Sequence, residues 1–236
     1  FRYHSIKFGE SRMRYIQKQH PPRLLTEWIQ KNKHDINFNY DLLRQDKTAI
    51  QSLSEALLKE QYYLCAYTGL RLDNSTFHIE HLKPQEYCER GEDVDYKNLV
   101  ACYPEPNRPS KLLYGAHKKD NWPSPEEEKD FVSPLNPVCE NKFQFTKKKK
   151  IKGVDNSANT TIEKLGLNHS ELVDLRKSSL KPLLELKRSK ASKRLSEINT
   201  PSDGKLEDFC FAKKQVLEKQ IIKLEAIIQS KGRKQT

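Results

Sequence analysis

Apolar residues repeat at helical spacing in the first quarter of the chain. Residues 46–60 place Ile50, Leu53 and Leu57 on one helical face, and Asp46 stands where it can cap the first turn. This pattern predicts an amphipathic helix. The preceding stretch "PPRLLTEWIQ" (residues 21–30) predicts a shorter helix entered through its two prolines, because proline is well tolerated in a first turn.

The middle of the chain is rich in β-forming residues. Residues 62–69, 76–82 and 96–104 each predict an extended strand. The three prolines of "YPEPNRPSK" predict a loop over residues 103–111, and residues 112–122 predict one or two helical turns. Residues 130–146 alternate prolines with apolar and aromatic residues, which indicates an irregular segment wrapped on the core.

Beyond a lysine run at 147–150, which marks a boundary in composition, the pattern becomes helical again. Residues 159–168 and 170–195 predict helices, the second kinked or interrupted at Pro182. A last helix over about residues 205–230 carries one apolar stripe: Leu217, Ile221, Leu224 and Ile228. We expect this stripe to pack on the chain's own core, with docking of a partner protein as the alternative.

The distribution of charge differs between the N-terminal and C-terminal parts of the chain. The net charge is +11, and residues 142–236 hold 23 Lys and Arg against 11 Asp and Glu, whereas residues 1–141 hold 20 against 21. Clustered positive charge favours binding to phosphate backbones, although basic segments also serve solubility. The chain has no phosphate-binding G-x-x-x-x-G-K-[ST] sequence, so nucleotide sensing would require another subunit.

Other features of the sequence narrow the class of protein. No apolar run is long enough to span a bilayer and no secretory signal begins the chain, so we expect a cytoplasmic protein without membrane association. Residues 1–12, before the only methionine, are read as a leader or upstream extension outside the fold. Five cysteines without close pairs indicate free thiols; a structural zinc is not expected, and its alternative would need scattered ligands: Cys65, Cys102 and Cys139.

The stretch "FHIEHLKPQ" (residues 77–85) carries the candidate chemistry. Glu80 and His81 are adjacent at a strand end that Pro84 terminates, so both project into a turn. A carboxylate can bind a hard divalent cation while a neutral imidazole takes a proton from water, and phosphodiester hydrolysis needs both functions. His117 and Asn121 stand four residues apart, on one face if this stretch is helical, and Asn98 at a strand entry can pin the loop that bears His81.

This order of Glu-His, Asn and His-x-x-x-Asn resembles the HNH endonuclease motif, in which a β-hairpin and a helix grip one divalent metal. More closely, the chain resembles the PtuB-type HNH endonucleases of Septu and retron antiphage systems. The resemblance runs over nearly the whole chain, through these segments: "MRYIQK", "LCAYTG", "HIEHLKPQ", "DYKNLVAC", "HKKDN", "NPVCENKFQF", "TIEKLGLN" and "LVDLR". It implies an α+β fold, mainly helical with an embedded ββα-metal core: an HNH nuclease core with N-terminal helices at 13–146 and a basic helical region at 147–236 that packs on the core or on a partner.

The resemblance also implies roles for individual residues. His81 would be the general base and Asn98 the loop-orienting asparagine; Glu80 and His117 would bind one Mg²⁺ or Mn²⁺ ion, with Asn121 as a further ligand or phosphate contact. Lysines expected to contact nucleic-acid phosphates are Lys83, Lys118 and Lys119. His78 receives no role: it lies on the same side of the strand as Glu80 and could support the metal ligands, but a structural histidine is the simpler interpretation.

The implied activity is metal-dependent hydrolysis of nucleic acid, with DNA favoured, as the effector of an antiphage system. The implied partner is a PtuA-like ATPase of the ABC/SMC type, joined in retrons by a reverse transcriptase and its multicopy DNA. The alternatives are an effector that cleaves tRNA or another RNA, and a non-catalytic module that binds nucleic acid or a partner. One departure from the family is Thr68, which stands where many HNH proteins have a zinc-binding cysteine.

Overall fold

The computed structural model describes residues 14–106, 108, 110–146, 148–198 and 200–232, so the expected leader at 1–12 lies outside the described residues. The protein is α+β and mainly helical. Its α-helices are α1 (Arg23–Asn32), α2 (Tyr40–Leu43), α3 (Lys47–Glu60), α4 (Ala116–Lys119), α5 (Asn156–Lys164), α6 (Ser170–Leu180), α7 (Arg188–Ile198) and α8 (Cys210–Gly232). The strands are β1 (His78–His81), β2 (Leu99–Cys102), β3 (Phe143–Phe145) and β4 (Ile151–Gly153). Short 3₁₀ turns lie at Gln85–Tyr87, Glu92–Val94, Tyr96–Asn98, Pro125–Asp130, Cys139–Asn141 and Lys181–Glu185.

The helices with the strongest sequence signals form as expected. The Asp46 carboxylate accepts hydrogen bonds from the amides of Thr48 and Ala49, which satisfies two of the unpaired donors in the first turn of α3. α3 buries its apolar face, including Leu53 and Leu57. The helix expected over 170–195 is interrupted as predicted, because Pro182 lies in the 3₁₀ turn between α6 and α7. α2 was not anticipated.

Strands β1 and β2 form a two-stranded antiparallel sheet in which His78 pairs with Cys102 and His81 with Leu99. The prediction of a strand at 62–69 is wrong: this segment contains turns and one isolated bridge from Leu64 to Arg71. The Gln61 side chain explains this difference. Its side-chain oxygen accepts the Ala101 backbone N–H (2.7 Å), a donor that a further strand would have used, while the Ala101 C=O accepts both the Gln61 side chain (2.8 Å) and the Ala66 amide (3.1 Å).

The lysine run marks a boundary in composition, and its described residues, 148–150, lie in the turn of a hairpin. β3 and β4 pair antiparallel on either side of it, with Phe143 opposite Gly153. Lys147 itself lies outside the described residues. The expectation of irregular structure over 130–146 is therefore wrong at its C-terminal end. Arg176 of α6 holds the hairpin turn, because its guanidinium donates to the Lys149 carbonyl at 2.8 Å.

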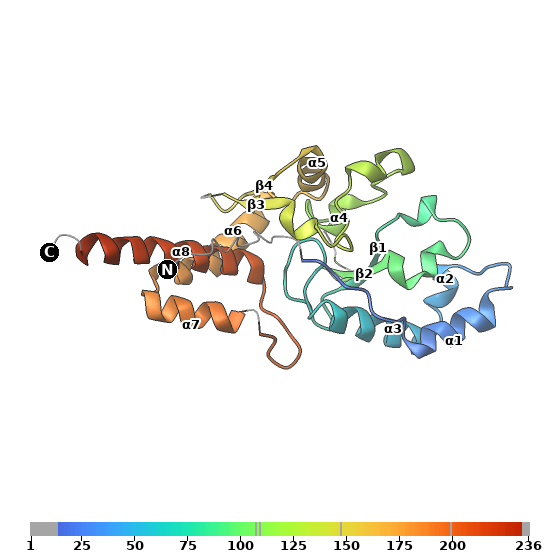
Figure 1. Cartoon of the computed structure of the whole chain (residues 1–236). Helices are drawn as coiled ribbons and strands as arrows, with labels where there is room; N and C mark the ends of the chain where they lie inside the picture. The colour runs from blue at the N-terminus through green and yellow to red at the C-terminus, as the bar shows by residue number, and fades with distance from the viewer. Residues whose placement is uncertain (1–13, 107, 109, 147, 199, 233–236) are drawn as a thin grey trace.

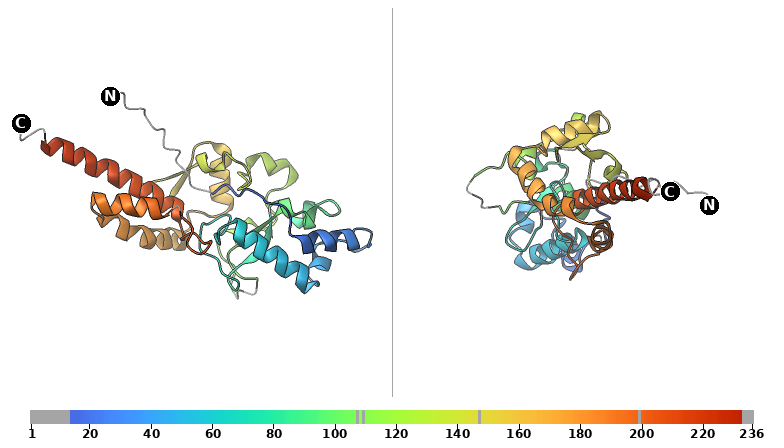
Figure 2. Two further views of the ribbon diagram at one scale, coloured as in Figure 1. Left: turned by 60° about the horizontal axis from the view of Figure 1, so that its bottom comes forward. Right: turned by 90° about the vertical axis from the view of Figure 1, so that its left-hand side faces the viewer.

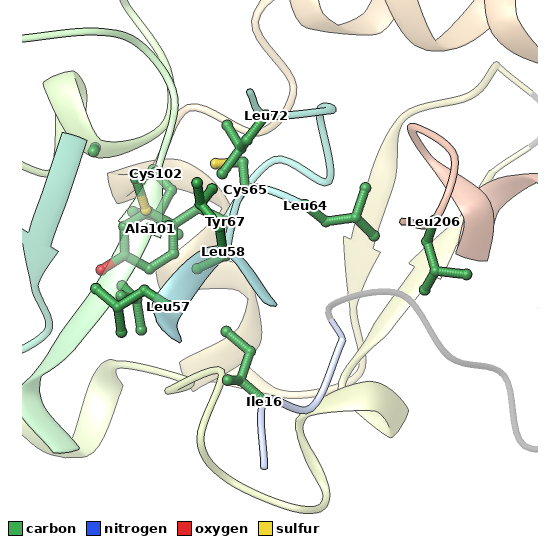
Figure 3. Close-up of a cluster of buried hydrophobic side chains, with 14 of the residues drawn as sticks. Ile16, Leu57, Leu58, Leu64, Cys65, Tyr67, Leu72, Ala101, Cys102 and Leu206 are labelled. Carbon is green, nitrogen blue, oxygen red and sulfur yellow. The ribbon is translucent and has the colours of Figure 1, made fainter. Parts of the chain in front are cut away.

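The core joins both halves of the chain. Figure 3 shows Ile16, Leu57 and Leu58 gathered with side chains from the 64–72 segment, from β2 and from Leu206 of the C-terminal half. α7 and α8 extend away from the sheet and the N-terminal helices (Figures 1 and 2). The apolar stripe of α8 consequently packs only in part, since Leu217 is fully buried whereas Ile228 is 57% exposed.

Candidate functional site

A cavity of about 420 Å³ opens beside β1 and α4. Its lining includes five residues that the sequence singled out: Glu80, His81, His117, Lys119 and Asn121. β1 contributes the first two, and the short helix α4 with the residues after it contributes the others. The fold therefore brings together side chains that are as many as 41 residues apart in the sequence.

Glu80 lies at the centre of this group. Its Oε1 is 3.0 Å from the Lys119 ammonium, and its Oε2 is 3.4 Å from Nε2 of His78. Burial by itself would raise the pKa of Glu80, but Lys119 and then His78 outweigh this effect and lower the pKa. The carboxyl group is thus ionised at neutral pH, as a cation ligand must be.

His81 is buried, with 7% of its surface exposed, and its ring packs edge-on against Tyr40. Nε2 donates to the Asp93 carbonyl at 2.9 Å; a carbonyl can only accept, so the neutral ring carries its proton on Nε2 and a lone pair on Nδ1. Burial is the main reason that the pKa of His81 is lowered. A neutral imidazole with a free Nδ1 is the form that a general base requires.

Asn98 lies just before β2, outside the cavity lining, and ties together the loop that follows His81. Its Oδ1 accepts from the Lys83 amide at 2.7 Å, and its Nδ2 donates to the Lys83 and Glu92 carbonyls, both at 3.2 Å. These are the contacts expected of a loop-orienting asparagine. Its importance for catalysis stays a prediction.

His117 and Asn121 do not form the i, i+4 pair of the sequence interpretation. α4 ends at Lys119, because Asp120 adopts φ 50° and turns the chain away. Asn121 instead donates to the Glu86 carboxylate. His117 Nδ1 accepts the Leu112 amide at 3.1 Å, and burial is the first cause of its lowered pKa. The neutral His117 ring therefore carries its proton on Nε2, which does not fit the expected ligand role at that atom.

The three lysines expected at phosphates have different environments. The Lys119 side chain is only 1% exposed and bonds Glu80 and the His81 carbonyl, so a phosphate contact by Lys119 does not fit and that expectation is corrected. Lys83 pairs with Glu92, and Lys118 is exposed outside this cavity. Arg108 and Lys111 line the cavity instead. Sequence reasoning missed both, because they stand in a proline-rich loop without periodicity.

His78 lies on the same face of β1 as Glu80, as the sequence predicts, but its contacts could not be predicted from the sequence. Its Nδ1 donates to the Pro104 carbonyl at 2.5 Å, and its ring stacks near that of His117 with centroids 6.1 Å apart.

The three cysteines named as alternative zinc ligands do not share one environment. Cys65 and Cys102 are both buried in the core (Figure 3). Cys139 lies in a different environment, where its thiol contacts the Pro134 carbonyl at 3.8 Å. Among the described residues, no group of three or more His, Cys, Asp and Glu side chains could hold a metal ion.

The cavity nevertheless suits a cation that keeps part of its water shell. Mg²⁺ is usually bound through one or two carboxylates together with waters and substrate phosphates, and it seldom has an all-protein cage. Glu80 supplies an ionised carboxylate in an open, polar cavity, and one of its oxygens is free of Lys119. The donor set therefore fits a hydrated divalent cation.

Residues of the C-terminal half hold α4 in place. The Gly115 amide, at the start of α4, donates to the Leu165 carbonyl at 2.7 Å, and the Tyr114 hydroxyl donates to Glu171 at 3.1 Å. Gly166 adopts φ +57°, and a Cβ built there would lie 2.3 Å from the Leu113 carbonyl oxygen. A helix of four residues is too short to be stable alone, so these contacts determine where His117 lies.

We expect Gly166→Ala to destabilise the protein by clearly more than the roughly 1–2 kcal/mol that a left-handed backbone costs an L residue. The extra cost arises from the clash with Leu113. Gly204→Ala is the matched control, because Gly204 has φ +72° but no atom within 4 Å of the added Cβ. Urea unfolding gives the two free energies, and hydrogen exchange at the Gly115 amide should be faster in Gly166→Ala alone. Equal effects of the two substitutions would contradict the support role.

No protein-family profile and no curated protein matches this chain. Within the part of the chain that the structure describes, no helix is both long enough and apolar enough to cross a membrane. Because the comparisons show no relative, the proposed function depends on the geometry of the cavity.

Proposed function

We propose that this protein is a metal-dependent endonuclease of the HNH type that hydrolyses phosphodiester bonds of nucleic acid, with DNA as the favoured substrate. The observation that carries the proposal is the meeting of Glu80, His81 and His117 in one cavity beside an antiparallel strand pair and a short helix. Asn98 adds support, since it ties down the loop after His81.

Each side chain has a task in such a reaction. His81, through Nδ1, accepts the proton of the attacking water, and the Asp93 carbonyl keeps the ring in the required tautomer. Arg108 and Lys111 at the cavity wall attract the phosphate backbone. Glu80 would hold the divalent cation, which when bound neutralises charge on the phosphate and the leaving oxygen.

The proposal extends to the biological setting that the sequence resemblance implies. The protein acts as the effector of an antiphage system with a PtuA-like ATPase, and in a retron with a reverse transcriptase and its multicopy DNA. A metal site of this type reads phosphate and sugar geometry, so we expect base specificity and the choice between DNA and RNA to depend on other surfaces or on the partner.

Cleavage should depend on the cation. We expect the purified protein, supplied with its partner where required, to convert supercoiled plasmid to nicked and linear forms in Mg²⁺ or Mn²⁺. A chelator should stop the reaction because Glu80 then has no cation to hold, and excess Mg²⁺ should restore it. Gel quantification of plasmid forms measures the rates. Undiminished cleavage in the chelator, or no cleavage of DNA or RNA under any of these conditions, would contradict the proposal.

The Glu80–Lys119 ion pair favours a second candidate, a non-catalytic module that binds nucleic acid or a partner. In that protein the ammonium permanently neutralises the carboxylate, and the basic C-terminal half provides a salt-sensitive affinity. Such a binder would show nucleic-acid affinity that is indifferent to Glu80→Gln and to metal. The nuclease instead loses cleavage and metal affinity together in that variant.

A further inference from the structure

His78 and Glu80 stand on the same face of β1, two residues apart, and both line the cavity. Side chains at this spacing point the same way because strand residues alternate between faces. Both are largely withdrawn from solvent, with side chains 18% and 15% exposed. The pair is therefore held in a defined geometry at the wall of the cavity.

Backbone hydrogen bonds give Nδ1 opposite roles in His78 and His117. The Pro104 carbonyl can only accept, so Nδ1 of His78 carries a proton. Burial would lower the pKa of His78, but Glu80 outweighs burial and raises it, so Nε2 can donate its own proton to Glu80 Oε2; a cation would displace that proton and take the lone pair of Nε2. The Leu112 amide can only donate, so the lone pair of His117 is engaged at Nδ1 and its proton is on Nε2. Metal-binding histidines in proteins usually donate their second ring nitrogen to a carbonyl or carboxylate, as His78 does and His117 does not.

The distance between the two donor atoms also suits a shared cation. His78 Nε2 and Glu80 Oε2 are 3.4 Å apart. Two neighbouring ligands of an octahedral cation, each about 2.1 Å from it, are separated by roughly 3 Å. Lys119 binds the other carboxylate oxygen, Oε1, and so turns Oε2 toward His78. Without a cation the two atoms share a hydrogen bond, so a chelated cation would take the place of the shared proton with little movement of either side chain.

We propose that His78 and Glu80 are the two protein ligands of the divalent cation, and that His117 serves as a hydrogen-bond donor. This inference rests on the proposed nuclease function and names the ligands of its metal. His117, with its ring near that of His78, presents Nε2–H to a phosphate oxygen or a water. Lys119 acts as a positioning residue, because it orients Glu80 and bonds the His81 carbonyl at 2.8 Å.

Mn²⁺ binding to the full-length protein tests the ligand assignment without any need for activity. Electron paramagnetic resonance measures the free Mn²⁺ during a titration. The affinity for Mn²⁺ should be at least about tenfold weaker in His78→Ala and in Glu80→Gln than in the wild type, because loss of even a residue that only hydrogen-bonds a metal ligand weakens metal affinity by about that much. His117→Ala should stay within about threefold, and His34→Ala, at an exposed site, should match the wild type. Spin-echo modulation from a bound imidazole nitrogen should vanish in His78→Ala alone.

A second measurement covers the case in which His78→Ala fails to fold. In the metal-free wild type, imidazole ¹⁵N shifts at slightly alkaline pH should show the proton on Nδ1 of His78 and on Nε2 of His117. Addition of diamagnetic Mg²⁺ should shift His78 Nε2 strongly. The opposite tautomers, or a Mg²⁺ shift confined to His117, would overturn the assignment.

Mn²⁺ binding and cleavage, measured on the same variants, distinguish a failure of this inference from a failure of the nuclease proposal. If His117→Ala loses Mn²⁺ while His78→Ala keeps it, the ligand assignment is wrong, and cation-dependent cleavage by the wild type still supports the nuclease. If the wild type binds Mn²⁺ through His78 but never cleaves, the cation site stands and the nuclease proposal fails. Absence of Mn²⁺ binding by the wild type, with and without nucleic acid, overturns the inference.

Discussion

Replacement of His81 by alanine should reduce the rate of cleavage by about 100- to 10,000-fold, the range that a positioned general base contributes. The substitution removes the imidazole at the end of β1 whose neutral ring has its lone pair on Nδ1. His81→Gln is the informative partner variant, because its amide can still donate to the Asp93 carbonyl while it cannot accept a proton. Single-turnover cleavage of a labelled duplex in Mg²⁺ measures both variants.

The control for this prediction is His34→Ala, at an exposed position outside the cavity, which should cleave as the wild type does. The pH profile supplies an independent check. Burial lowers the pKa of His81 below 6.5, so the rate should rise with pH through a midpoint under 6.5 and then level off as the ring becomes neutral. Cleavage retained by His81→Gln at the wild-type rate would refute the base assignment.

Glu80→Ala should lower the free energy of unfolding by about 3 kcal/mol, measured in a chelator so that no metal contributes. The substitution leaves the Lys119 ammonium, whose side chain is 1% exposed, without its carboxylate. We expect the lower end of the usual range for a buried pair because Glu80 is 15% exposed toward the cavity. The double variant Glu80→Ala/Lys119→Met should be more stable than the sum of the two single losses predicts.

Lys111→Ala is the matched control for this effect. It breaks the Lys111–Asp120 pair, whose side chains are 62% and 67% exposed, and should change stability by less than about 1 kcal/mol. The pKa of Glu80 is lowered in the folded protein, so its stabilising contribution is present above pH 4.5 and is lost as the pH falls through the lowered value. Urea unfolding at pH 7 and in acid measures this. Equal losses in Glu80→Ala and Lys111→Ala would contradict the buried pair.

Local sequence signals were sufficient where one residue decides a local geometry. Asp46 caps α3 through its own carboxylate, and Pro182 interrupts a helix because it lacks an N–H. The same reasoning failed at residues 62–69. There Gln61 occupies the Ala101 N–H that a strand would need, and this competition involves residues 40 positions apart.

The lysine run shows a second limit. Its charge indicates exposure, but exposure is equally compatible with a linker and with a hairpin turn. Arg176, from α6, decides between them by its bond to the Lys149 carbonyl. The charge of the lysine run therefore predicts that it lies at the surface, whereas its hairpin conformation depends on the contact with Arg176.

For the candidate site, the sequence by itself determined which chemical groups are present and their order: a carboxylate beside an imidazole at a strand end, an asparagine before the next strand, and a later histidine. Only the tertiary structure decided what each group can do. Lys119 is buried against Glu80, and two backbone groups, at Pro104 and Leu112, make Nδ1 of His78 a donor and Nδ1 of His117 an acceptor. The physical reason is that a side chain's protonation and hydrogen-bonding partners depend on atoms brought near by folding, which neighbours in sequence do not specify.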